Sequence, residues 1–154
     1  METATVGAHA VLVAACLCAA YLDIRYRRLP NWLSALTLIA GVVLAGVAGG
    51  FPAVGAVAIH VVIALAVGMA LFAMGWIGAG DAKFYAAVSA WFSWHYAAAL
   101  AGAIGIGGLV LLVAWFPLRK MGRGKEDPLF RQLPFGVAIA LGALLAHFGV
   151  ALVA

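Results

Sequence analysis

Charged side chains are scarce in this sequence. Its 154 residues include nine Lys and Arg and five Asp and Glu, whereas 68% of the residues are hydrophobic. Soluble domains are about half apolar and about a quarter charged. The composition therefore excludes an ordinary soluble domain and indicates an integral membrane protein, with almost no room for a separate aqueous domain. We expect residues 1–154 to form a single transmembrane domain.

Cysteine is nearly absent too, and no basic region precedes the first apolar segment. Cys16 and Cys18 are two positions apart within that segment, a spacing that fits neither a disulfide framework nor a zinc pair. Because Thr5–Leu22 lacks a basic n-region, we expect a retained span there rather than a cleaved signal peptide.

Apolar segments long enough to cross a bilayer make up most of the chain, since a span needs roughly 20 apolar residues, or about 17 at the short end. The run 84–117 would form a helix of about 51 Å, longer than a hydrocarbon core of about 30 Å, so we divide it near Ser93–Tyr96. Asn31 is expected to cap the second helix. The predicted spans are about 6–22, 32–49, 53–75, the two halves of 84–117, and 134–150.

The distribution of positive charge supports six spans. With that number, all nine Lys and Arg fall in three loops on one side of the membrane, as the positive-inside rule expects of cytoplasmic loops. We predict an all-α, multi-pass bundle of about six transmembrane helices, with both termini non-cytoplasmic. We attribute the net charge of +4 to anchoring at the surface of the lipid bilayer and not to nucleic-acid binding. The three loops contain Arg25, Arg27 and Arg28; Lys83; and Arg119, Lys120, Arg123, Lys125 and Arg131.

Two acidic residues, Asp23 and Asp81, end up on the same side of the membrane because two complete spans separate them. Two carboxylates that meet in a partly buried cavity cannot both ionise cheaply, so they share a proton. An aspartic protease uses such a pair: one carboxylate takes a proton from water while the other polarises the scissile carbonyl. The simpler interpretation is that each Asp only caps or anchors a helix end. Because the pair titrates as a unit, the sequence assigns the resting proton to neither residue.

Gly78 and Gly80 precede the second aspartate, and Lys83 follows it. The glycines would supply either a positive φ or clearance for a peptide backbone, and close helix packing is the alternative. Lys83 would not face Asp81 on a regular helix. Its charge either anchors the helix at the membrane surface, or biases the titration of the pair or docks an acidic group of a substrate.

Three segments resemble the type IV prepilin peptidases, a family of membrane aspartic proteases. "GAGDAKFYAAVSAW" is similar to its Gly-x-Gly-Asp-x-Lys signature, "LDIRYRRLPNWL" to its first catalytic segment, and "LPFGVAIALGALLA" to the Pro-aromatic-Gly opening of its last span. The resemblance implies that Asp23 and Asp81 are catalytic and that Gly78, Gly80 and Lys83 support them. Candidates for lining the cleft are Pro30, Asn31, Pro134 and Gly136.

Larger members of that family carry a cytoplasmic N-terminal region with paired CxxC motifs and methylate the new N-terminus. This sequence has neither feature and resembles the short, peptidase-only form associated with tight-adherence (Flp) pili. The resemblance implies an aspartic endopeptidase of the bacterial inner membrane that removes the leader of Flp-type prepilins at the cytoplasmic membrane face, without a cofactor or metal. The oligomeric state stays open.

Two other functions remain open. One is a related enzyme acting on archaeal preflagellins or on pseudopilins. The other is a non-enzymatic transporter or pilus-assembly subunit that uses the aspartates as a proton relay, although apart from His60 the span interiors offer few polar groups. Presenilin-like proteases share the Gly-x-Gly-Asp element but place their other Asp after Tyr, whereas Asp23 follows Leu22. The histidines are expected far from both aspartates and not to bind a metal: His9, His60, His95 and His147.

Overall fold

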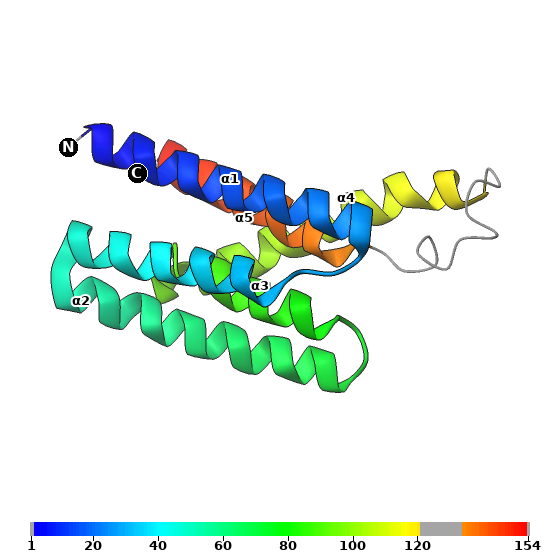
Figure 1. Ribbon diagram of the computed structural model, residues 1–154, viewed down its shortest axis with the longest axis horizontal. Coiled ribbons are helices and arrows are strands. Elements are labelled where there is room, and N and C mark those ends of the chain that lie inside the picture. Colours follow the sequence, from blue (N-terminus) through cyan, green and yellow to red (C-terminus); the bar gives the residue numbers. More distant parts are fainter. Residues whose placement is uncertain (1, 121–133, 154) are drawn as a thin grey trace.

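A computed structural model describes residues 2–120 and 134–153 of the chain, and the side chains of 7, 9–114 and 134–149. Over the described residues the fold is entirely helical (Figure 1). The predicted all-α class is therefore confirmed. The basic third loop lies outside the described residues, and so do the side chains of Arg119 and Lys120. The elements are α1 (Glu2–Tyr26), α2 (Asn31–Ala73), α3 (Ala79–Ser89), the 3₁₀ turn η1 (Trp94–Tyr96), α4 (Ala97–Lys120) and α5 (Phe135–Val153).

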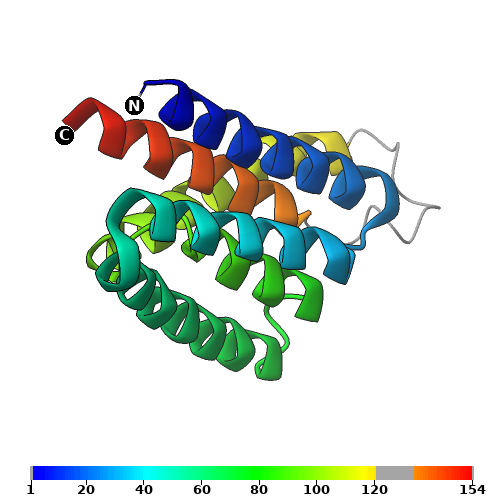
Figure 2. The same cartoon turned by 60° about the vertical axis from the view of Figure 1, so that its left-hand side comes forward.

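Helix α2 is a hairpin of two helical arms. Its 43 residues would extend about 65 Å if they were straight. At Gly50 the backbone leaves the helical region (φ 63°, ψ −154°) and Pro52 follows, so the chain reverses direction there. Figures 1 and 2 show the first arm (31–49) and the second arm (51–73) side by side and antiparallel. The two arms correspond to the predicted second and third spans, separated where the sequence predicts.

Helix α3 is short, with 11 residues or about 16 Å, and it packs against both arms of α2. Gly41 on the first arm and Gly68 on the second permit this close approach. A Cβ at these positions would lie 2.9 Å from the Ala90 Cβ and 3.1 Å from the Ala82 Cβ, respectively. Since α3 begins at Ala79, the Gly-x-Gly-Asp motif lies at the start of this helix and not in a loop before it.

Two hydrogen bonds hold the chain just after α3. The Trp91 indole N–H donates to the Thr37 carbonyl on the first arm (3.0 Å), and the Phe92 carbonyl is bonded to Nδ1 of the buried His60 on the second arm (2.9 Å). The chain then passes through η1 into α4, which confirms the predicted break near Ser93–Tyr96.

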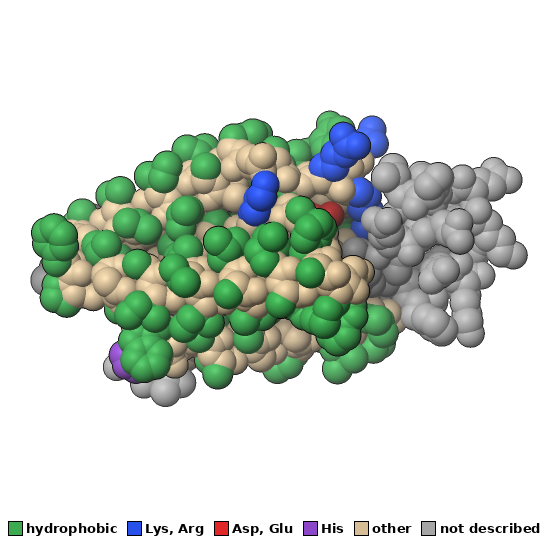
Figure 3. All heavy atoms as spheres, turned by 90° about the horizontal axis from the view of Figure 1, so that it is seen from below, with side chains coloured by type: hydrophobic (Ala, Val, Ile, Leu, Met, Phe, Trp, Pro, Cys, Tyr) green, Lys and Arg blue, Asp and Glu red, His purple; other side chains and the backbone are tan. Residues whose placement is uncertain are grey.

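Within residues 2–120 and 134–153, three helices are long and apolar enough to cross a membrane: His9–Tyr26 of α1, the whole of α2, and Trp94–Ala114, which includes η1. In α5 the apolar stretch Phe135–Gly149 is shorter. Figure 3 shows apolar side chains over most of one face, with the visible Lys and Arg side chains in one half of it. Such an exposed apolar surface is expected where lipid is the solvent.

A compact core joins α1, α3, α4 and α5. Helices α1 and α5 lie side by side with α4 packed on α5 (Figure 2). This core brings the C-terminal end of α1 and the N-terminal end of α5 next to the start of α3. Its largest buried side chains are Leu12, Phe84, Leu100 and Ile139.

Gly50 generates a testable prediction because its φ of 63° is unfavourable for residues with a side chain. Gly50→Ala should lower the free energy of unfolding by about 1–2 kcal/mol, although there is room for the methyl group. The matched control is Gly55→Ala in the second arm, which also has open space but no positive φ, and which should be neutral or slightly stabilising. Thermal unfolding of both variants in one detergent checks this. Equal melting temperatures would show that the reversal does not depend on Gly50.

Candidate active site

Asp23 lies in the last turn of α1 and is buried, with 6% of its surface exposed. Its Oδ2 accepts a hydrogen bond from the Val137 backbone N–H at 3.2 Å. Val137 is in the first turn of α5, where backbone N–H groups lack partners within the helix and the helix dipole is positive. The start of α5 thus provides the compensation that a buried carboxylate requires.

Gly136 leaves room for this contact. A Cβ at that position would lie 2.9 Å from Asp23 Oδ2 and 2.9 Å from Leu29 Cδ1, closer than real Cβ atoms approach other groups. Pro134 directly precedes α5 and is buried, as expected of a proline at the start of a helix. Gly136 therefore lies against Asp23.

Asp81 is the third residue of α3 and its carboxylate turns back toward the start of the helix. The Gly78 N–H donates to Asp81 Oδ2 at 3.1 Å, so the side chain satisfies one of the unpaired donors of the helix N-terminus. The carboxylate is held by the same type of donor as that of Asp23, on a different helix.

The two motif glycines permit close contacts within the chain, and neither has a positive φ. Gly78 is extended (φ −77°, ψ 154°), and a Cβ there would lie 3.0 Å from Asp81 Oδ2. Gly80 is inside α3, and a Cβ there would lie 3.2 Å from the Leu29 carbonyl oxygen. Of the roles expected from the sequence, a positive φ is therefore excluded, and the contact of Gly80 with Leu29 corresponds to the packing alternative. In this region positive φ values belong instead to Arg27 (φ 53°) and to Gly75 (φ 75°), in the turn after α2.

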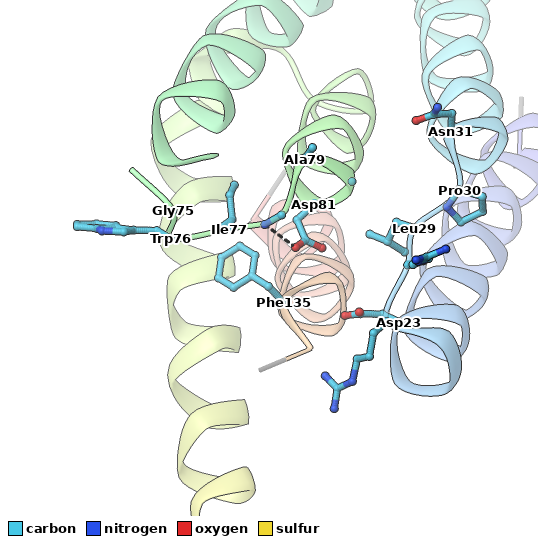
Figure 4. Close-up of a pocket in the computed structure, with 14 residues that line it drawn as sticks. Asp23, Leu29, Pro30, Asn31, Gly75, Trp76, Ile77, Ala79, Asp81 and Phe135 are labelled. Carbon is cyan, nitrogen blue, oxygen red and sulfur yellow. Dashed lines mark hydrogen bonds between the residues drawn. The ribbon is translucent and has the colours of Figure 1, made fainter. Parts of the chain in front are cut away.

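Both aspartates line one open cavity of about 950 Å³. Figure 4 shows Asp23 and Asp81 entering it from α1 and α3, with Leu29 and Phe135 nearby. The predicted residues Pro30 and Asn31 line it too, as do Gly78 and Gly80, whereas Lys83, Pro134 and Gly136 do not. Sequence reasoning did not identify Leu29, Trp76, Ile77 or Phe135 as lining residues. Of these four, only Phe135 could have been identified from the sequence, because it is the aromatic residue of the Pro-aromatic-Gly pattern.

Lys83 contacts Asn31 and not the aspartates. Its Nζ donates to Asn31 Oδ1 at 3.0 Å and thereby links α3 to the first residue of α2. The expectation that Asn31 caps α2 is wrong: Pro30 is at the N-cap position and Asn31 begins the helix. The amide that would have capped the helix is bonded to Lys83.

The environment of Asp81 favours its neutral form. Burial, and next the negative charge of Asp23, raise the pKa of Asp81 from 3.8 to about 6, although the Gly78 N–H acts in the opposite direction. Asp81 lies outside the candidate spans. The influence of Asp23 on this pKa also shows that the two carboxylates are close enough to interact.

None of the four histidines lines the cavity that contains the aspartates. His60 is bonded to the Phe92 carbonyl, His9 contacts His147 between α1 and α5, and His95 lies in η1. Among the side chains that the structure describes, no three His, Cys, Asp or Glu gather in a way that could hold a metal ion.

The sequence profile of the type IV leader peptidase family matches residues 10–116, which include both aspartates. The match covers more than half of the chain and confirms the resemblance seen in the sequence motifs. It ends before α5, so the contact of α5 with Asp23 comes from the structure alone. No curated protein and no solved structure gives a significant match.

The raised pKa of Asp81 predicts a pH-dependent gain in stability when its charge is removed. The stabilising contribution of the neutral carboxyl is fully present below 3.8 and is lost as the pH rises through about 6. Asp81→Asn is neutral at every pH and keeps an oxygen for the Gly78 N–H. It should therefore melt several degrees above the wild type at pH 8 and at about the same temperature at pH 4. A gain that does not change with pH would contradict burial of the Asp81 charge.

Proposed function

Because this chain belongs to the type IV leader peptidase family, we propose that it is a membrane aspartic endopeptidase in which Asp23 and Asp81 are the catalytic pair. The observation that carries the proposal is the opening of both carboxylates into one cavity, although 57 residues separate them in the sequence. Each is held by a backbone N–H at the start of a helix, which leaves the carboxylates directed at a common space.

The reaction is direct hydrolysis by water. One carboxyl of the pair is ionised and takes a proton from a water molecule as the water oxygen attacks the scissile carbonyl carbon. The other is protonated and donates its proton to the carbonyl oxygen; burial and the charge of Asp23 raise the pKa of Asp81 to about 6, which favours a single proton shared by Asp23 and Asp81. As the tetrahedral intermediate breaks down, the first carboxyl delivers its proton to the leaving amine and the second regains one from the intermediate, so no covalent enzyme intermediate forms.

The substrate is the precursor of an Flp-type pilin, cleaved at the cytoplasmic face of the inner membrane. Two observations support this side: Arg27 and Arg28 line the cavity, and Lys83 follows Asp81 by two residues on α3. Positive residues mark the cytoplasmic side of membrane proteins. The proposal keeps six spans and two non-cytoplasmic termini, with α2 counted as two spans and α3 as one, although α3 with its 11 residues is shorter than a full span and is not among the candidate spans. A preflagellin or pseudopilin would fit the same cavity, and direct comparison of precursors distinguishes them.

The first test is replacement of each aspartate. Asp23→Asn and Asp81→Asn should each reduce cleavage of a purified pilin precursor by about 10²–10⁴-fold, the range that proton transfer contributes. Both proteins should still insert and purify as folded species. Near-normal turnover by either variant would exclude the pair, and a wild-type protein that cleaves no precursor would favour a non-enzymatic role.

The second test concerns Gly136. Gly136→Ala should displace the Asp23 carboxylate from the Val137 N–H, because a Cβ would lie 2.9 Å from Oδ2. We expect cleavage per folded molecule to fall about 10–100-fold, because an ångström-scale misplacement of a reacting group has this effect. The melting temperature should fall as well, because the buried carboxylate loses its donor. Gly149→Ala on the same helix meets no neighbouring atom and should leave cleavage unchanged. An active Gly136→Ala variant would show that Asp23 needs no such placement.

A further inference from the structure

A second, smaller cavity of about 170 Å³ adjoins the one that contains the aspartates. Ile77 and Phe135 line both cavities and form the boundary between them. The smaller cavity lies deeper along the helices than the aspartates, since Leu71 and Ile139 line it about one turn from the ends of α2 and α5 nearest the motif. Apart from the Tyr85 hydroxyl its lining side chains are apolar.

This cavity lies between the second arm of α2 and α4. Within the described part of the chain, α4 packs mainly on α5, and α2 mainly on α3, so the second arm and α4 are not packed together. Leu71 belongs to one side of the gap and Gly105 to the other. Both Val67 and Gly105 are exposed, so the gap opens sideways, toward the region that lipid occupies. We call it the lateral groove.

The helix α4 leaves the groove unfilled. A Cβ on Gly105 would meet no atom within 4 Å, whereas the same test on Gly107, two residues later, places it 3.0 Å from the Ala138 carbonyl oxygen of α5. Gly107 is therefore needed for packing between α4 and α5, and Gly105 is not. The open space at Gly105 is not taken up by any described side chain.

We propose that the lateral groove receives the apolar segment of the precursor that follows the scissile bond, with one large apolar side chain filling the cavity. This inference rests on the proposed function. A volume of 170 Å³ is close to that of apolar cavities that hold a benzene ring, so it matches one aromatic or branched side chain. An apolar segment in the bilayer reaches this groove from the side, and its continuation past Ile77 and Phe135 enters the cavity with the aspartates.

The groove would supply part of the substrate binding energy away from the reacting bond. Filling it should therefore weaken recognition of precursors that have an apolar segment, while the chemistry at Asp23 and Asp81 is unchanged. A lipid acyl chain is the competing occupant. It would fill the groove without any link to cleavage, and the experiment distinguishes the two.

The test compares Gly105→Leu with Gly102→Leu. Both glycines are exposed on α4 with no atom within 4 Å, but only Gly105 lines the groove. Each variant is assayed with a pilin precursor that contains its apolar segment and with a short soluble peptide that ends just after the scissile bond. We expect Gly105→Leu to lower kcat/KM at least about tenfold for the precursor and to leave the peptide unaffected, while Gly102→Leu changes neither. Equal effects of the two variants, or a loss with the peptide as well, would overturn the inference.

A second measurement does not depend on turnover. A photoreactive benzophenone amino acid at position 105 in the Asp81→Asn protein should cross-link the intact precursor, and the same group at position 102 should not. Capture of lipid alone at position 105 would overturn the groove as a substrate site. Cross-linking at position 105 together with a wild-type protein that cleaves no precursor would retain the groove and reject the proposed function. Cleavage without cross-linking would do the reverse.

Discussion

Two backbone N–H groups at helix starts make the cavity possible. A carboxylate in an apolar bundle is costly unless its oxygens find donors, and the chain has few polar side chains to offer. Gly78 at the start of α3 and Val137 at the start of α5 provide these donors. Because the donors belong to the backbone, the position of each carboxylate is fixed by where its helix begins.

Leu29 lies next to both of these helix starts. Its carbonyl and Cβ approach Gly80 on α3, and its Cδ1 approaches Gly136 on α5. Residues that are far apart in the sequence thus share one neighbour in the short connection between α1 and α2. The absence of a side chain at each glycine sets how closely α3 and α5 approach this connection, and hence how closely the two aspartates approach each other.

The sequence predicts much of this arrangement because its strongest signals are local. Gly50 and Pro52 mark the reversal of α2, and the Ser93–Tyr96 segment marks the break before α4. The same-side placement of Asp23 and Asp81 follows from counting spans.

The contacts between distant segments could not be predicted. Asn31 has a side chain typical of a helix N-cap, yet in the folded chain its amide oxygen accepts a hydrogen bond from Lys83 on α3. The lining role of Phe135 and the lateral groove depend on how α2, α4 and α5 pack, which no local pattern specifies. The end of α3 at Ser89 could not be predicted, because the apolar residues Ala90, Trp91 and Phe92 follow it directly.

Hydrogen bonds just after the C-terminal end of α3 fix this end of the helix relative to α2. Trp91 and Phe92 fasten it to both arms of α2, and Asp81 lies about 12 Å away along the axis from Ser89. A rotation of only about 5° around the fastened end would move the carboxylate by about 1 Å, enough to change the rate of a reaction about 100-fold. The Lys83–Asn31 hydrogen bond lies in the N-terminal half of α3, on the same side of the fixed end as Asp81. This exposed hydrogen bond, to a residue that lines the cavity, acts together with the packing of Gly80 against Leu29 and of Ala82 against Gly68 to limit the angle that sets the separation of the two carboxylates.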